Sequence, residues 1–222
     1  VDWSGGNDTG PRPRRDAIWA CAAGSEPVYL RNRANAEAAL SDRIDAALSK
    51  DERLLIGFDF PFGYPAGFAQ ALTGKTCPFA VWSWLANRIE DTPKTNNRFD
   101  IAAAINLDLG GGHGPFWGNP LGREIAGLAR TKAGYRNPFP ERRRSETIAR
   151  GAFSCWQLAG AGAVGSQVLM GLPVLHRLRL RFPGHIAVWP FEPLDRRIAF
   201  VEIWPSLLAK QVKAAEGPRD IR

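Results

Sequence analysis

The sequence predicts a single α/β domain over residues 1–222, interrupted by a long, mostly helical insertion over residues 66–184. Short apolar runs of strand character open the chain and return near its end. The middle instead combines helical patterns with Pro- and Gly-rich loops. A length of 222 residues suits one large domain, and 45% hydrophobic with 23% charged residues excludes a disordered or fibrous chain.

The first sixty residues predict the order strand, hairpin, helix, strand. Val1–Trp3 has the character of a strand end, and residues 17–22 and 27–30 flank a turn, as in a hairpin. Asn32 can cap a helix that runs to about Ser49, because apolar residues recur there every four positions. The apolar run at residues 53–60, which Pro61 ends, is typical of a buried central strand.

The rest of the chain predicts helices first and strands afterwards. Helical patterns cover residues 79–90, 98–109 and 164–181. Strand signals follow at residues 186–189 and 198–204, each closed by Trp-Pro, and Ser206 can cap a last helix over Leu207–Ala215.

Three acidic residues stand at the ends of predicted strands: Asp2, Asp59 and Glu202. Reacting groups of open α/β sheets gather at the carboxyl ends of parallel strands, so we expect these side chains to meet there. Converging carboxylates repel one another unless a divalent cation neutralises them, and hard oxygen ligands favour Mg²⁺ or Mn²⁺. The three acids are therefore the expected metal ligands and catalytic residues. Taken one at a time, each also fits a structural role in a turn or on an edge strand.

Blocks around these acids carry a resemblance to a known family. They are Val-Asp-Trp-Ser-Gly at residues 1–5, Gly-Phe-Asp-Phe-Pro-Phe-Gly-Tyr-Pro at 57–65 and Val-Glu-Ile-Trp-Pro-Ser at 201–206. Four further blocks lie between them: Asn97–Phe99, Gly114–Gly118, Gly165–Gln167 and Val188–Glu192. In their order and spacing, over nearly the whole chain, the blocks resemble a domain-of-unknown-function family of predicted nucleases with an RNase H-like fold.

The resemblance implies a mixed five-stranded sheet in the order 3-2-1-4-5, with the insertion between strands 4 and 5. Strands 1, 4 and 5 would then lie side by side and bring Asp2, Asp59 and Glu202 together. RNase H-like nucleases generally add an acid from the last helix. This chain departs from that pattern, because it offers only Glu216 and Asp220 there, in poorly suited positions.

Candidate substrate-binding residues come from three places. A basic run with interleaved aromatic residues includes Arg142, Arg143 and Arg144, and such a run suits phosphate contact and base stacking, although charged runs are often only solvated loops. Ser166 stands where a helix begins, whose N–H groups can bind an anion. The turn containing Ser4 resembles the phosphate loop of actin-like kinases.

Composition narrows the class of protein. The formal net charge of +7 fits a polyanionic partner such as nucleic acid. The three cysteines are far apart and offer neither a zinc site nor a disulfide framework, which together with a polar N-terminus predicts a cytoplasmic location. The charge-free stretch Gly151–Leu175 contains five glycines and a proline, so we expect a buried segment and no membrane span.

These observations lead to a metal-dependent nuclease or phosphodiesterase that hydrolyses nucleic acid at a carboxylate-bound Mg²⁺ ion. Two alternatives remain open. One is an enzyme acting on a small phosphorylated or cofactor-like substrate, for example in cofactor biosynthesis, with the insertion as a lid. The other is a non-catalytic nucleic-acid-binding module with a degenerate acidic site.

Overall fold

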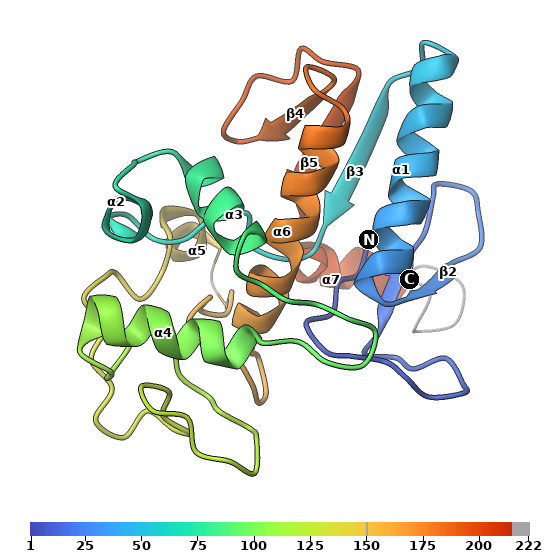
Figure 1. The fold of residues 1–222 in the computed structure, drawn as a ribbon. Coiled ribbons are helices and arrows are strands. Elements are labelled where there is room, and N and C mark those ends of the chain that lie inside the picture. The colour runs from blue at the N-terminus through green and yellow to red at the C-terminus, as the bar shows by residue number, and fades with distance from the viewer. Residues whose placement is uncertain (150, 215–222) are drawn as a thin grey trace. The chain divides into compact units, whose positions relative to one another are not determined.

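The computed structural model describes residues 1–149 and 151–214, which divide into two compact units (Figure 1). The first unit comprises Val1–Phe60 and the described residues from Leu178 onward, and the second comprises Pro61–Arg177. The second unit thus occupies the middle of the chain, where the sequence predicts an insertion over residues 66–184.

The first unit holds the strands of the protein. Its elements are β1 (Ile18–Ala20), β2 (Val28–Arg31), α1 (Arg33–Ser49), β3 (Leu54–Phe58), β4 (Ile186–Trp189), β5 (Ile198–Glu202), the 3-10 helix η1 (Pro205–Leu208) and α7 (Ala209–Ala214). The predicted hairpin is confirmed as the antiparallel pair β1–β2. Helix α1 is also confirmed, and its cap is the expected one, because the Asn32 side chain accepts a hydrogen bond from the backbone N–H of Asn35 at 2.9 Å.

The predicted end of the chain differs from the structure in one respect. A single helix was expected over Leu207–Ala215 with Ser206 as its cap, but Ser206 lies inside η1, and α7 follows directly. Glu216 and Asp220 lie outside the described residues.

The prediction of one mixed five-stranded sheet in RNase H-like order is wrong. The described strands form two sheets, the antiparallel pair β1–β2 and a parallel sheet in the order β3–β5–β4. Val1–Trp3 hydrogen-bonds to both sheets but forms no strand of its own. It makes an isolated bridge between Asp2 and Trp19 on one side and backbone hydrogen bonds to β3 on the other. A single bridge does not extend into the ladder that would join the two sheets.

The core of the first unit lies on one face of the parallel sheet. Side chains of a strand alternate between the two faces, and Ile56 and Phe58 of β3 share theirs with Ile198 and Phe200 of β5. All four are buried, and the rings of Phe58 and Phe200 pack edge to face with centroids 5.4 Å apart. The opposite face of the same strands carries the exposed side chains of Leu55 and Trp189.

The second unit is helical and rich in loops. Its elements are α2 (Phe68–Thr73), α3 (Pro78–Ala86), α4 (Arg98–Gly110), α5 (Arg144–Ile148) and α6 (Gly165–Arg181), whose last turn belongs to the first unit. The helices predicted over residues 79–90, 98–109 and 164–181 are confirmed as α3, α4 and α6, with shifted ends.

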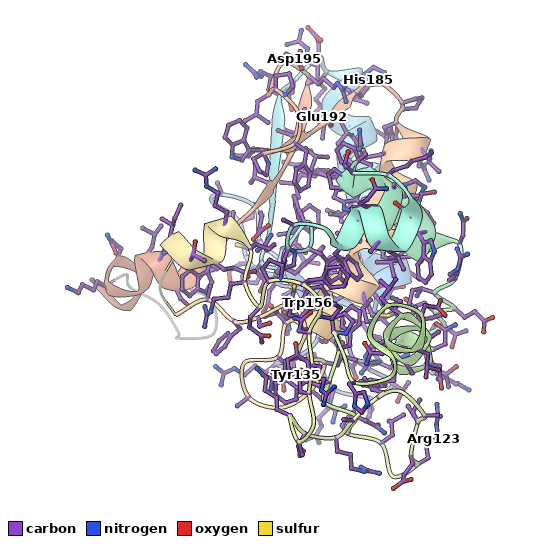
Figure 2. All side chains as sticks on the ribbon, turned by 90° about the vertical axis from the view of Figure 1, so that its left-hand side faces the viewer. Arg123, Tyr135, Trp156, His185, Glu192 and Asp195 are labelled. Carbon is purple, nitrogen blue, oxygen red and sulfur yellow. The ribbon has the colours of Figure 1, made fainter. Side chains whose placement is uncertain are left out.

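An aromatic cluster forms the core of the second unit. Trp156 lies at its centre (Figure 2), and four other rings have centroids within 6 Å of it: Tyr64, Phe68, Phe116 and Phe139. The indole Nε1 donates to the carbonyl oxygen of Pro140 at 3.1 Å, which satisfies its polar atom.

No helix within residues 1–149 and 151–214 combines the length and the apolar character that crossing a lipid bilayer requires.

Candidate active site at the end of β3

The site begins with the backbone of Val1–Trp3, which runs beside the end of β3. The backbone nitrogen of Val1 donates to the carbonyl oxygen of Gly57 at 2.7 Å, and the N–H of Asp59 donates to the carbonyl oxygen of Val1 at 3.4 Å. This is the hydrogen-bond pattern of two parallel strands in which Val1 lies opposite Phe58. The next pair along the two segments is therefore Asp2 and Asp59, with both side chains on one face.

Aromatic packing on the opposite face fixes this orientation. Trp3 is buried against Phe58 and Phe60, with ring centroids 6.1 and 5.5 Å apart. Because alternate residues of an extended chain point to opposite faces, burial of these three rings directs Asp2 and Asp59 away from the core. The N–H of Trp3 also donates to Oδ1 of Asp59 at 2.8 Å, which holds that carboxylate against the neighbouring segment.

The two carboxylates perturb each other strongly. Burial raises the pKa of Asp59 to about 7, and the negative charge of Asp2 acts in the same direction, whereas the N–H of Trp3 opposes both effects. Partial burial raises the pKa of Asp2 as well, while a hydrogen bond from the Asp59 side chain lowers it. Below about pH 7 Asp59 therefore carries a proton, which it donates to Asp2.

The register of the parallel sheet separates Glu202 from this pair. Glu202 is paired with Phe58, so it stands on the face of the buried phenyl rings, whereas Asp59 is the next residue and faces the other way. The structure thus pairs Asp2 with Asp59 on one face of the sheet and places Glu202 on the other face.

The loop after Asp2 is held by Arg33, a residue that no sequence pattern indicates. The Arg33 side chain is only 2% exposed, and its Nη1 donates to the carbonyl oxygens of Ser4 at 3.1 Å and Gly6 at 2.6 Å. The hydroxyl of Ser4 accepts a hydrogen bond from the N–H of Gly6 at 3.1 Å. Position in the sequence gives no signal of this role, since arginine at the first turn of a helix is usually exposed.

The three candidate arginines of the second unit differ in what they contact. Arg143 forms an ion pair with Glu146, with Nε and Oε1 2.7 Å apart, and both side chains are largely buried. Nη1 of Arg142 donates to the carbonyl oxygen of Ala152 at 2.6 Å. Arg144 is exposed at the first position of α5. Of the three, Arg144 is therefore the one best placed to meet a ligand in solution.

Ser166 is engaged inside the second unit. Its hydroxyl donates to the carbonyl oxygen of Leu158 at 2.6 Å and accepts from Nε of Arg98 at 3.0 Å. The residue is buried, so its hydroxyl serves the packing of α6 against the preceding loop.

The residues that suit a metal ion are Asp2 and Asp59. Their carboxylates supply hard oxygen ligands from two neighbouring backbone segments, the type of donor that Mg²⁺ and Mn²⁺ prefer. No group of three or more His, Cys, Asp or Glu side chains in the described part of the chain is arranged to hold an ion. Mg²⁺ commonly binds through one or two carboxylates and completes its shell with water and substrate phosphate, so a pair of this kind fits it.

Comparison with known proteins adds no relative. No protein-family model, no curated protein and no solved structure matches this chain.

Proposed function

We propose that the protein is a divalent-metal-dependent phosphodiesterase that acts on nucleic acid, with Asp2 and Asp59 as the ligands of the ion. One observation carries the proposal: two carboxylates stand opposite each other on adjacent parallel segments, where burial and the neighbouring charge raise the pKa of Asp59. Without a metal ion, a proton reduces the repulsion between the two carboxylates. A bound divalent cation would take over that role.

The ion, when bound, would activate water and stabilise charge on the leaving oxygen in an in-line displacement. The chain's own residues supply the position of the ligands. The N–H of Trp3 orients Oδ1 of Asp59, and the buried guanidinium of Arg33 fixes the loop that follows Asp2. Because both supports are buried or backbone groups, the carboxylates are preorganised before a substrate arrives.

The distribution of charge supports a polyanionic substrate. Of the 29 Lys and Arg residues, 13 lie within Pro61–Arg177, against 7 of the 22 Asp and Glu residues. The second unit thus carries +6 of the formal net charge of +7, which leaves the first unit, with its acidic pair, nearly neutral. An excess of cationic side chains attracts phosphate backbones and speeds their association.

The decisive experiment compares Asp59→Asn with Glu202→Gln in nuclease assays on single- and double-stranded DNA and RNA with Mg²⁺ or Mn²⁺. Asparagine preserves the acceptor for the N–H of Trp3 but removes the charge, so we expect cleavage to fall at least about a hundredfold, whereas Glu202→Gln retains activity. Cleavage that persists in Asp59→Asn would refute the assignment.

Two further measurements separate the alternative functions. Titration with Mn²⁺ by calorimetry should show binding that Asp59→Asn loses, and a non-catalytic module with a degenerate site should show none. Affinity for a nucleic-acid polymer should fall steeply as salt rises, whereas an enzyme for a small phosphorylated substrate should show a shallow dependence.

A further inference from the structure

The outward face of the parallel sheet is apolar and accessible. Trp189 of β4 is paired with Val201 of β5, which in turn is paired with Gly57 of β3, so these three residues form one row across the face. Trp189 is 53% exposed, and Leu55, two residues before Gly57 on the same face, is 65% exposed. Two large apolar side chains exposed on one sheet face are unusual for a surface that serves only solvation.

This face is the one that carries the acidic pair. Gly57 and Asp59 are two residues apart on an extended segment, so they point to the same side of the sheet. A Cβ atom built on Gly57 would lie 3.0 Å from the side chain of Ile203, which shows that Ile203 also lies on this side. The side chains of Val201 and Ile203 therefore form an apolar surface between the two carboxylates and Trp189.

Strand geometry gives the scale of this surface. From β3 to β4 there are two strand spacings, about 10 Å, and from the row of Gly57 to that of Asp59 two residues, about 7 Å. The backbone of Trp189 thus lies about 12 Å from that of Asp59. A ligand that reaches both must carry a flat ring at one end and a charged group at the other, joined by a flexible link.

We infer that Trp189 is the stacking platform for a nucleobase of the substrate, while the phosphate of that strand lies at Asp2 and Asp59. The inference rests on the proposed function and extends it, since it adds a subsite that binds the nucleobase as well as the phosphate. Tryptophan stacks on any base, so the subsite selects base-bearing single strands without selecting a sequence.

The acidic pair argues against a second copy of the chain as the occupant. A protein partner that covered the sheet face would also cover Asp2 and Asp59, and burying carboxylates without a cation is costly. A nucleotide with an accompanying divalent ion brings the compensating charge with it. The same face therefore suits a phosphate-bearing ring better than an apolar protein surface.

The test measures the binding of two fluorescent probes, a single-stranded thymidine octamer and an abasic octamer with the same sugar-phosphate backbone, in EDTA and in Mg²⁺. We expect Trp189→Ala to weaken binding of the thymidine octamer about tenfold and to leave the abasic octamer unchanged. Trp189→Phe should restore most of the affinity, because a phenyl ring still stacks. Leu180→Ala is the matched control, since Leu180 is an exposed apolar residue of α6 in the first unit.

Three results would overturn the inference: equal binding of the octamer by Trp189→Ala and wild type, an equal loss for the abasic probe, or self-association in sedimentation that Trp189→Ala abolishes. Failure of the proposed function is separate from these, because it appears as cleavage or Mn²⁺ binding that survives Asp59→Asn. The ratio of the affinities for the two octamers, measured in EDTA, depends neither on cleavage nor on metal binding.

Discussion

The backbone N–H of Trp3 donates to Oδ1 of Asp59 at 2.8 Å, although the two residues are 56 positions apart in the chain. The same tryptophan buries its ring against Phe58 and Phe60. One residue thus couples the hydrophobic core to the placement of a carboxylate, and the acidic pair depends on that coupling.

The raised pKa of Asp59 predicts how stability depends on pH. The folded protein keeps this proton up to about pH 7, whereas an unfolded chain loses it near pH 4. Between these values the folded state binds more protons, so its free energy of unfolding falls as pH rises and levels off above pH 7. Asp59→Asn cannot ionise and should gain roughly 2–4 kcal/mol relative to wild type between pH 4 and pH 8.

Urea denaturation in EDTA at several pH values measures this effect. Wild type and Asp59→Asn should differ little at pH 4, diverge steadily up to about pH 7 and change little beyond it. Parallel pH profiles for the two proteins would show that Asp59 has an ordinary pKa in the folded state.

Replacement of Arg33 should destabilise the first unit. Arg33→Ala leaves the carbonyl oxygens of Ser4 and Gly6 without their buried donor, and we expect a loss of about 2–4 kcal/mol in the free energy of unfolding. Arg43→Ala is the control, because Arg43 is an exposed residue of the same helix. Equal urea midpoints for the two variants would contradict the role given to Arg33.

The two neighbouring arginines of the basic run should behave differently. Arg143→Ala leaves the buried Glu146 carboxylate without its cation and should cost about 3 kcal/mol of stability. Arg144→Ala should leave stability unchanged and reduce the salt dependence of oligonucleotide binding by about one unit of slope. Denaturation and anisotropy titrations on both variants check this, and an unchanged salt slope for Arg144→Ala would remove that residue from the phosphate contacts.

Glycine substitutions in the second unit offer a matched comparison of packing. A Cβ atom at Gly114 would lie 2.2 Å from the carbonyl oxygen of Arg136, which is backbone and cannot rotate away, whereas Gly122 has open space around it. Gly114→Ala should therefore cost about 2–3 kcal/mol, and Gly122→Ala should stay within about 0.5 kcal/mol of wild type. Thermal unfolding of both variants decides the point, and similar midpoints would mean that the loop at Gly114 adapts.

Local patterns identified the longer helices and the strands β1 to β5, but not α2 or α5, because capping and periodicity are properties of a few neighbouring residues. Asn32 illustrates this, since a side-chain cap followed by apolar residues at every fourth position marks the start of α1 and its buried face. The arrangement of the strands was predicted less well. Pairing between distant segments decides whether Val1–Trp3 joins two sheets or only bridges them, and no periodicity in the chain records that pairing.

The site shows the same limit at the level of single residues. A position at the end of a strand predicts which edge of the sheet a residue occupies, and Asp59 and Glu202 both occupy the carboxyl edge. The face depends on register, and a shift of one residue separates the two side chains. Burial of Arg33 was likewise not predictable, because its partners are backbone carbonyl groups that come close only after folding.

The alternation of Phe58, Asp59 and Phe60 also fixes the register of β3 during folding, and with it the position of the Asp59 carboxylate. A slip of β3 by one position would push a carboxylate into the interior and leave two phenyl rings in water, and both changes are heavily penalised. A folded state with β3 out of register is thus strongly destabilised, whether or not a ligand is bound. The buried rings of Phe58 and Phe60 therefore fix the relative position of Asp2 and Asp59, although neither ring contacts the substrate.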